Sequence, residues 1–359
     1  MPEFEVEIRT DPVLTTAGPQ SNGPEVAYDL HDWPDELPQH DETITVAVMD
    51  SGIHEEQVEN HPWFEGVEVA KRYDAAGDSP GNDAVGHGTG VASIISKNAT
   101  ELAGILGVDD LGIEFYDVRI FGDSGRSGMT TILKAYKWLL DHADEIDIVN
   151  MSWGARGNVS QINQVHEKLI ARGVHDVVAA GNTGEDGGSP ATSREAFSAG
   201  AVDGNGEPAR FSSLDPDRGN PDVSALGVDC KMARASGTNM GEPLDDEFTK
   251  ASGTSFASPY TAAAYVIGMY AKQGSWDERF IETAPDIPGS EQDGGGLLKL
   301  GGALDGEMPD DPNPTYDAAT WDISGDVVWF SGDVLPKSLS TRVEVLDDTD
   351  EHTDLRVHK

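Results

Sequence analysis

The sequence is poor in cysteine, in basic residues and in long hydrophobic runs. Its one cysteine, Cys230, leaves no intramolecular disulfide and no cysteine-based zinc site. There are 24 Lys and Arg against 65 Asp and Glu, a formal net charge of −41. We therefore expect neither nucleic acid nor an anionic membrane as a partner, because both bind basic surfaces. No run approaches the roughly 18 apolar residues that a transmembrane helix needs.

The first residues, "MPEFEVEIRTDPV", lack the basic start and apolar stretch of a secretory signal peptide. We expect a cytoplasmic protein, or a secreted one if the chain is a trimmed form. The acidic residues are spread along the whole chain, between apolar segments. This composition indicates a protein adapted to molar salt, where the Debye length is only about 3 Å and self-repulsion is screened. The alternative is an ordinary acidic protein.

Short apolar runs alternate with helical patterns from residue 44 onward. Near-continuous apolar strands are typical of a parallel sheet that is buried on both faces. The sequence therefore predicts an α/β fold, a doubly wound and mainly parallel sheet flanked by helices. The expected strands are 44–50, 113–121, 146–153, 176–182 and 197–202, and the expected helices are 91–97, 130–142, 160–173 and 256–272.

The predicted organisation has three parts. Residues 1–43 are rich in proline and acids and form an N-terminal extension. Residues 44–304 form the α/β domain. Residues 305–359 begin with the Pro- and Asp-rich stretch "DGEMPDDPNPT" and end in a small β appendage, because "WDISGDVVWFSGDV" has two short alternating stretches around a glycine.

Three glycine-rich motifs place an acid, an imidazole and a hydroxyl at strand or helix ends. "VMDSG" puts Asp50 at a strand tip, "VGHGTG" puts His87 at a helix start, and "GTSFASP" puts Ser255 at the start of an apolar helix. Taken singly, each has an ordinary structural role, such as a turn residue or a helix N-cap. Taken together they suggest nucleophilic catalysis, because active sites in such sheets lie at the carboxyl ends of the strands.

The three motifs, in the order Asp, His, Ser, resemble those of the subtilisin-like serine proteases, the subtilases. The resemblance covers roughly residues 44–304. It implies a serine endopeptidase in which Ser255 is the nucleophile, His87 the base and Asp50 the residue that orients it. "AAGN" (179–182) resembles the strand end that carries the oxyanion-hole residue, here Asn182.

Two further segments resemble the backbone strands that flank a bound peptide in this family. They are Ser127 and Gly128 in "RSG", and Ser152, Trp153 and Gly154 in "NMSWG". The resemblance also implies that Gly154 and the run "GGSPA" (187–191), which includes Gly188, line the pocket for the side chain before the cut bond. Glycines there would leave room for a sizeable apolar side chain, so we expect polypeptide substrates with such residues.

The chemistry needs no cofactor, but the resemblance implies structural calcium. "KNATELAG" (97–104) resembles the family's calcium loop, and Asn98, Thr100 and Glu101 supply oxygen atoms. Residues 1–43 are too short and polar for the prodomain of secreted members. Either that domain was removed, or this member folds without it. Another interpretation lays the segment over the cleft as an inhibitory arm.

Two other functions remain open from the sequence, and we expect a monomer in each case. The first is a catalytically silent subtilase fold used for binding or assembly. The presence of Asn182 and of the three residues of the triad, Asp50, His87 and Ser255, argues against it, because an inactive relative is free to lose at least one of the four. The second is a serine-carboxyl peptidase with a Glu base, which "GHGTG" disfavours because His87 occupies the base motif.

Overall fold

The computed structural model describes two parts of the chain, divided at residues 305 and 306. In the first part, Met1–Asp305, the described residues are 8–9, 21–34, 43–77, 80–106, 112–214, 221–271, 276–287 and 296–305. In the second, Gly306–Lys359, they are 320–324, 327–331, 342–348 and 353–358. Within these residues, no helix combines the length and hydropathy needed to cross a membrane.

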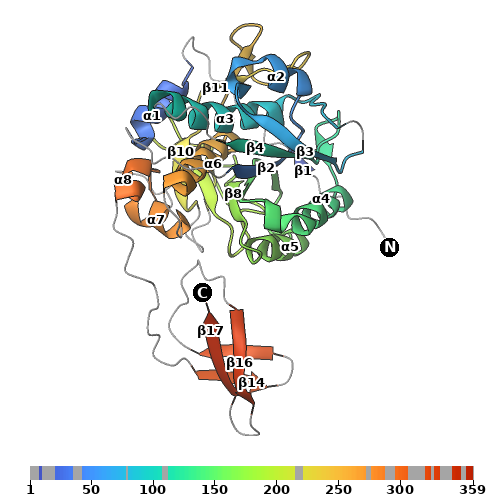
Figure 1. Cartoon of the computed structure of the whole chain (residues 1–359), viewed down its shortest axis with the longest axis vertical. Coiled ribbons are helices and arrows are strands. Elements are labelled where there is room, and N and C mark those ends of the chain that lie inside the picture. The colour runs from blue at the N-terminus through green and yellow to red at the C-terminus, as the bar shows by residue number, and fades with distance from the viewer. Residues whose placement is uncertain are drawn as a thin grey trace. The chain divides into compact units, whose positions relative to one another are not determined.

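A seven-stranded sheet forms the centre of the first part (Figure 1), and every pair of neighbouring strands in it is parallel. Its order is β10-β9-β8-β6-β2-β4-β3. The predicted α/β fold with a parallel sheet is therefore confirmed. The strands are β2 (Ile44–Asp50), β3 (Glu68–Asp74), β4 (Ile113–Arg119), β6 (Ile148–Met151), β8 (His175–Ala179), β9 (Ser198–Val202) and β10 (Val223–Leu226).

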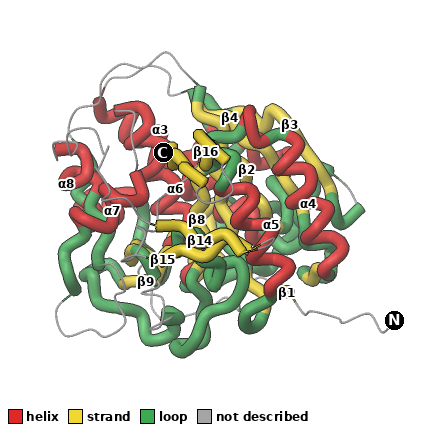
Figure 2. Tube along the Cα trace, turned by 90° about the horizontal axis from the view of Figure 1, so that it is seen from below, coloured by secondary structure: helices red, strands yellow, loops and turns green. Residues whose placement is uncertain are grey.

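Helices cover both faces of this sheet, which explains why its strands are apolar on both sides. In β2, Val46 and Val48 point to the face covered by α3 (His87–Leu106) and α6 (Thr254–Ala271). Ala47 and Met49 point to the opposite face, covered by α4 (Met129–Asp141) and α5 (Ser160–Ile170). Figure 2 shows α4 and α5 running side by side.

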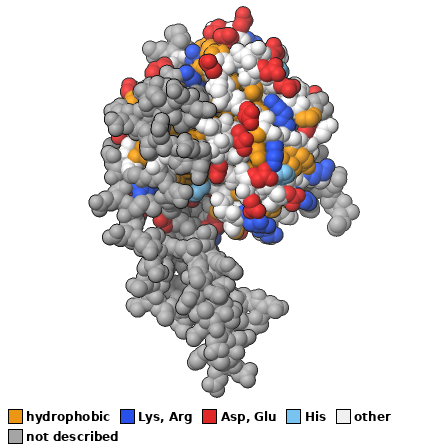
Figure 3. Space-filling view, in the orientation of Figure 1, with side chains coloured by type: hydrophobic (Ala, Val, Ile, Leu, Met, Phe, Trp, Pro, Cys, Tyr) orange, Lys and Arg blue, Asp and Glu red, His pale blue; other side chains and the backbone are white. Residues whose placement is uncertain are grey.

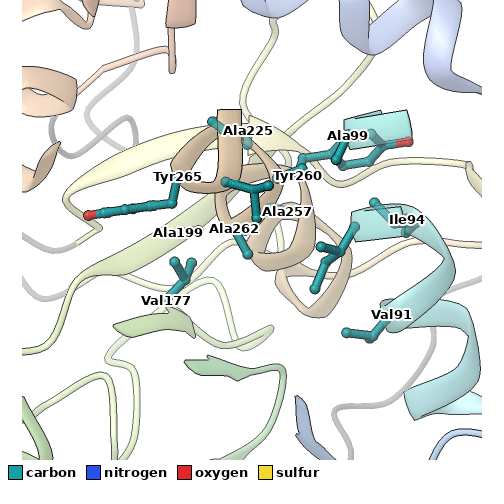
Figure 4. Packing of buried hydrophobic residues seen from close by; sticks show 14 of the residues in the cluster. Val91, Ile94, Ala99, Val177, Ala199, Ala225, Ala257, Tyr260, Ala262 and Tyr265 are labelled. Carbon is teal, nitrogen blue, oxygen red and sulfur yellow. The ribbon is translucent and has the colours of Figure 1, made fainter. Parts of the chain in front are cut away.

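Helix α6 is buried almost all round and is rich in small residues. Its alanines and tyrosines pack against α3 and against the strands of the sheet (Figure 4). Small side chains let other elements approach its backbone closely. At Gly268 the approach is close, since a Cβ there would lie 2.8 Å from the indole ring of Trp276. The helix expected over 256–272 is therefore confirmed, and its burial explains why it is apolar.

Part of the predicted N-terminal extension belongs to this fold. Helix α1 (Pro24–His31) packs on the domain, with Ala27 fully buried. His31 is also fully buried, and its ring bridges two distant backbone groups. Nδ1 lies 3.0 Å from the carbonyl oxygen of Leu298, and the N–H of Leu226 donates to Nε2 at 3.1 Å. The view of residues 1–43 as an extension separate from the domain is therefore wrong for α1.

Smaller elements complete the first part. An antiparallel sheet has the order β11-β13-β12, and a second small sheet has the order β5-β1-β7. These elements are β1 (Ile8–Arg9), α2 (Glu55–Asn60), η1 (Pro62–Phe64), β5 (Arg126–Ser127), η2 (Ala143–Glu145), β7 (Gly154–Ala155), β11 (Cys230–Ala233), β12 (Glu242–Pro243), β13 (Phe248–Ala251), α7 (Trp276–Thr283) and α8 (Leu300–Asp305).

The second part contains four strands in two antiparallel pairs. The first pair is β14 (Thr320–Ser324) with β15 (Val327–Ser331), which are the two alternating stretches expected around a glycine. The second is β16 (Arg342–Asp348) with β17 (Thr353–His358). The predicted β appendage is confirmed in these residues.

Candidate active site

Asp50 and His87 meet at the carboxyl end of the central strand. Asp50 is the last residue of β2, and His87 is the first residue of α3. His87 Nδ1 lies 2.8 Å from Asp50 Oδ1, and neither residue is exposed. A carboxylate can only accept, so Nδ1 carries the proton in this pair. In the neutral imidazole this leaves Nε2 as the basic nitrogen.

Ser255 lies at the second position of α6, one residue before an aromatic ring that reaches His87. The rings of Phe256 and His87 have centroids 5.6 Å apart. The Ser255 hydroxyl donates to the carbonyl oxygen of Ser152 at 3.1 Å. Because the first N–H groups of a helix have no partner within it, the start of α6 offers donors and a positive dipole end beside this hydroxyl.

Thr254, the first residue of α6, orients the side chain of Asn182. Its Oδ1 accepts hydrogen bonds from the backbone N–H of Thr254 at 2.8 Å and from the Thr254 hydroxyl at 3.0 Å. Among the described residues, the Nδ2 group of Asn182 has no hydrogen-bond acceptor although it is buried. A Cβ at Gly253 would lie 3.0 Å from this Nδ2. Glycine at 253 thus leaves space in front of a donor that is available to a ligand.

An extended segment of the chain already lies between the two predicted peptide-binding strands. Strand β1 is the middle strand of the small sheet, antiparallel to β5 and to β7. Ile8 is opposite Ser127 and Ala155, and Arg9 is opposite Arg126 and Gly154. Backbone groups of both segments therefore pair with an extended chain between them.

The model of the Subtilase family matches residues 41–283 of this chain. The chain belongs to the subtilases. The sequence-based identification of the family is thereby confirmed, and the chain is a serine-type peptidase, a hydrolase whose substrates are polypeptides.

Individual relatives agree with this assignment. Subtilisin DY from Bacillus licheniformis is 30% identical to this subtilase over 266 residues, which is 72% of this chain and 89% of that protein. Subtilisin E from Bacillus subtilis (strain 168) is 28% identical over 267 residues. That match covers 72% of this chain but only 64% of the longer relative.

A solved structure shares the fold. It is described as the crystal structure of a cold adapted subtilisin-like serine proteinase. The TM-score is 0.59 at 22% identity, and the match covers 77% of this subtilase and 97% of that chain. At this identity the likeness concerns the fold alone.

The other predicted peptide-binding residues have varied surroundings in this subtilase. Gly128 precedes α4, and no atom lies within 4 Å of a Cβ placed there. Trp153 is fully buried, and its ring centroid lies 6.4 Å from that of Tyr136, so its side chain packs in the core. At Gly154, a Cβ would meet its nearest atom, the carbonyl oxygen of Ser189, at 3.8 Å.

Gly188 is a glycine for a reason that the sequence did not suggest. A Cβ there would lie 1.8 Å from the carbonyl oxygen of Ala155, so the residue permits close contact between two backbone segments. The same two segments are also hydrogen-bonded, because the N–H of Ala155 donates to the carbonyl oxygen of Ser189 at 2.7 Å. This contact alone is a sufficient reason for a glycine here, and the role of Gly188 in a substrate pocket stays a prediction.

The predicted calcium loop is also wrong as a loop. Residues 97–104 continue helix α3 without a break, so Asn98, Thr100 and Glu101 lie on a helix. The Asn98 amide donates to the carbonyl oxygen of Ile94 at 2.7 Å, and the side chain also hydrogen-bonds to Tyr260. The side chains of Thr100 and Glu101 lie outside the described residues. The described residues contain no group of three or more His, Cys, Asp or Glu that could hold a metal ion. Asn98 does not fit a calcium site, and the expectation that the protein binds structural calcium stays a prediction.

Sequence reasoning missed two side chains that support the site. Thr254 orients Asn182, as described above. Asp83 precedes His87 by four residues and is fully buried beside the start of α3. Both carried a signal, because an acceptor shortly before a helix is a capping pattern.

Proposed function

We propose that this subtilase is a serine endopeptidase in which Ser255 is the nucleophile. His87 takes the hydroxyl proton as Ser255 Oγ attacks the carbonyl carbon of the substrate, and it then gives that proton to the leaving amine. Water hydrolyses the resulting acyl-enzyme by the same route. Asp50 holds the imidazole in the required tautomer and stabilises the imidazolium. The supporting observation is the buried 2.8 Å contact between Asp50 and His87, beside the start of α6.

Asn182 Nδ2 and the backbone N–H of Ser255 would donate to the oxyanion that develops during attack. Support comes from the buried Nδ2 group that lacks an acceptor among the described residues, and from its place in front of Gly253. Such donors stabilise the transition state because they are fixed before the reaction begins.

A serine-directed fluorophosphonate probe tests this mechanism in molar NaCl. The protein should become labelled, and Ser255→Ala should lose all labelling while keeping its far-UV circular dichroism. Ser252→Ala is the matched control, since Ser252 lies three residues earlier and its hydroxyl accepts from the N–H of Asp229 at 2.8 Å. It should keep the label. A folded wild-type chain that takes up no probe would instead support a silent binding protein.

Substrate would bind as an extended strand between β5 and β7, with an apolar side chain before the cut bond. The position of β1 supports the strand mode, and the absence of a side chain at Gly154, where a Cβ would meet no atom closer than 3.8 Å, supports the apolar preference. A peptide library read by mass spectrometry would check the preference. A strict requirement for Lys or Arg before the cut bond would contradict it.

The N-terminal segment would compete with substrate for these strands, because β1 lies where the substrate backbone would pair. The pairing with β7 is antiparallel. When a peptide residue lies opposite Gly154, the residue two positions later in that peptide therefore lies opposite Ser152, beside Ser255. In sequence, the second residue after Arg9 is Asp11, and Pro12 comes next. The bond before a proline is a tertiary amide whose nitrogen carries no hydrogen, so we expect slow cleavage there.

Removal of residues 1–20 tests this competition. It keeps α1, whose His31 is part of the fold. We expect KM for a short chromogenic peptide to fall while kcat stays the same, since the segment and the substrate compete for one place. Arg9→Pro should have the same effect, because proline cannot donate to the neighbouring strands. An unchanged KM in both variants would show that the segment does not compete.

Adaptation to high salt completes the proposal. The excess of acidic residues, 65 against 24 basic ones, supports it. Figure 3 shows Asp and Glu side chains at many separate places on the visible face of the first part. Spread carboxylates repel one another at long range unless salt screens them.

A further inference from the structure

Asp83 is a buried carboxylate that accepts hydrogen bonds on both of its oxygens. Oδ1 accepts from the Ser51 hydroxyl at 2.8 Å, from the N–H of Gly86 at 2.7 Å and from that of Val85 at 3.2 Å. Oδ2 accepts from the N–H and the hydroxyl of Thr89 at 2.9 and 2.7 Å. Each of these partners is a donor, and an ionised carboxylate suits such a set because it only accepts.

These contacts join the two elements that carry Asp50 and His87. Ser51 follows Asp50 at the end of β2, and its N–H donates to Asp50 Oδ1 at 2.6 Å. Its hydroxyl donates to Asp83 and also accepts from the N–H of Gly88 at 2.8 Å. Asp83 thus holds the chain on either side of the buried pair, at Ser51 next to Asp50 and around His87.

The two segments are also packed closely against each other. A Cβ at Gly88 would lie 2.4 Å from the carbonyl oxygen of Gly52. A Cβ at Gly52 would lie 2.4 Å from the carbonyl oxygen of Asn82, and the φ of Gly52 is +110°. Because Asn82 precedes Asp83, the backbone beside Asp83 touches the turn that follows Asp50.

The charge of Asp83 also opposes an unfavourable effect of helix α3. His87 is the first residue of that helix, where the positive end of the dipole disfavours an imidazolium. Asp83 places a negative charge on the N–H groups of Gly86 and Thr89 at this end. Besides Asp83, two charged groups lie near His87. One is its partner Asp50, and the other is Arg119, whose Nε donates to the carbonyl oxygen of Ser51 at 3.1 Å. Arg119 is itself paired with Asp74 and Asp123, at 3.0 and 2.9 Å.

We propose that Asp83 is a positioning residue for catalysis, which fixes the geometry of the Asp50–His87 pair and stabilises the imidazolium of the transition state. This inference rests on the proposed function, since it takes His87 as the base. It differs from a purely structural capping role, which would affect unfolding alone.

The test compares Asp83→Asn with the matched control Asp222→Asn. Asp222 is also a buried carboxylate, and its Oδ2 accepts from the N–H and the hydroxyl of Ser198 at 2.8 and 2.9 Å. Ser198 begins β9, so this site lies at the opposite end of the strands from Asp50. Both variants should unfold more easily in urea. If Asp83→Asn does not fold, Ser51→Ala provides a milder variant because the other donors to Asp83 remain.

For Asp83→Asn we expect kcat to fall about 10–100-fold, as small losses of alignment do, with KM nearly unchanged. The apparent pKa on the acidic limb of kcat/KM against pH should move down, since the imidazolium loses a nearby negative charge. Asp222→Asn should change neither. Wild-type kcat and pH profile in folded Asp83→Asn, or in Ser51→Ala if Asp83→Asn does not fold, would overturn the proposal. Absence of probe labelling in the wild type would instead overturn the proposed function.

Discussion

Ser152 and Ser255 exchange two hydrogen bonds between the end of β6 and the start of α6. The Ser152 hydroxyl donates to the carbonyl oxygen of Ser255 at 2.8 Å, and the Ser255 hydroxyl donates to that of Ser152 at 3.1 Å. Asn150 extends the connection, because its Nδ2 donates to Ser152 Oγ at 2.9 Å and its Oδ1 accepts from the Ser258 hydroxyl at 2.7 Å. The backbone of Ser255, the proposed nucleophile, is therefore attached to the sheet through buried polar groups.

Replacing Ser152 with alanine should lower both stability and activity. The Ser255 carbonyl and the Asn150 amide would each lose a buried partner, which costs about 1–3 kcal/mol of unfolding free energy. We expect kcat to fall as the start of α6 gains freedom. Urea unfolding and the rate of fluorophosphonate labelling measure the two effects.

The control for this variant is Ser96→Ala. Ser96 is also buried, and its hydroxyl also donates to a backbone carbonyl, that of Trp63. It lies nine residues beyond His87 along α3. A similar loss of stability with unchanged labelling is expected there. Equal labelling rates in Ser152→Ala and wild type would contradict a role for Ser152 in holding the nucleophile.

Thr254 should matter for activity through its hydroxyl alone. The hydroxyl donates to Asn182 Oδ1 at 3.0 Å and accepts from the N–H of Gly181 at 3.0 Å. Losing an oxyanion donor outright costs about 10²–10³-fold in kcat, a magnitude known from subtilisin. Thr254→Val removes one of the two donors to Asn182 Oδ1 and leaves the backbone N–H of residue 254 in place, so Asn182 is held less firmly and we expect a smaller fall in kcat at unchanged KM. Thr254→Ser retains the hydroxyl and should restore the rate, and a slow Thr254→Ser would argue against this explanation.

The sequence predicted the central fold and the candidate catalytic residues because both depend on local patterns. Asp50, for example, ends an apolar run that coincides with β2, and the motif around His87 coincides with the start of α3. These features need only a short window of sequence to recognise.

The elements that sequence reasoning missed depend on contacts between distant residues. Helix α1 is held by His31, whose hydrogen-bond partners are Leu226 and Leu298. No periodicity in residues 1–43 predicts these contacts. Strand β1 has two residues and owes its place to pairing with β5 and β7. The expected calcium loop failed for a different reason. Its Ala, Glu and Leu residues have high helix propensity, but the prediction of a loop followed the resemblance to the family instead.

His31 should make the protein less stable as the pH falls below neutrality. Burial lowers its pKa from 6.5 to about 4. Between these values the unfolded chain binds a proton that the folded chain excludes, so unfolding becomes more favourable as the pH falls through this range. The full difference is about 3 kcal/mol, at roughly 1.4 kcal/mol for each unit of pKa.

Urea unfolding between pH 7.5 and pH 4.5 at fixed high salt checks this prediction. His31→Gln removes the titrating group, so the variant should be less stable than wild type at pH 7.5 but should lose less stability on acidification. The comparison of slopes cancels the other groups that titrate in this range. Parallel curves for the two proteins would contradict the assignment of the pH dependence to His31.

Low salt should destabilise the protein through repulsion between its carboxylates. The Debye length grows from about 3 Å at 1 M salt to about 30 Å at 0.01 M. Carboxylates that are screened from one another in concentrated salt therefore repel one another across the molecule in dilute salt. We expect the urea midpoint to fall steeply as NaCl is removed. Sucrose serves as a control, since it favours the folded state without screening charge.

A charge-reduced variant separates screening from other effects of salt. Glu56, Glu59 and Glu65 are exposed in or just after α2 and η1. Replacing all three with glutamine removes three negative charges from one region while leaving the core intact. The variant should therefore be more stable than wild type in dilute buffer, and the two should converge in molar NaCl. Full stability of the wild type in about 10 mM NaCl would contradict salt adaptation, because repulsion is least screened there.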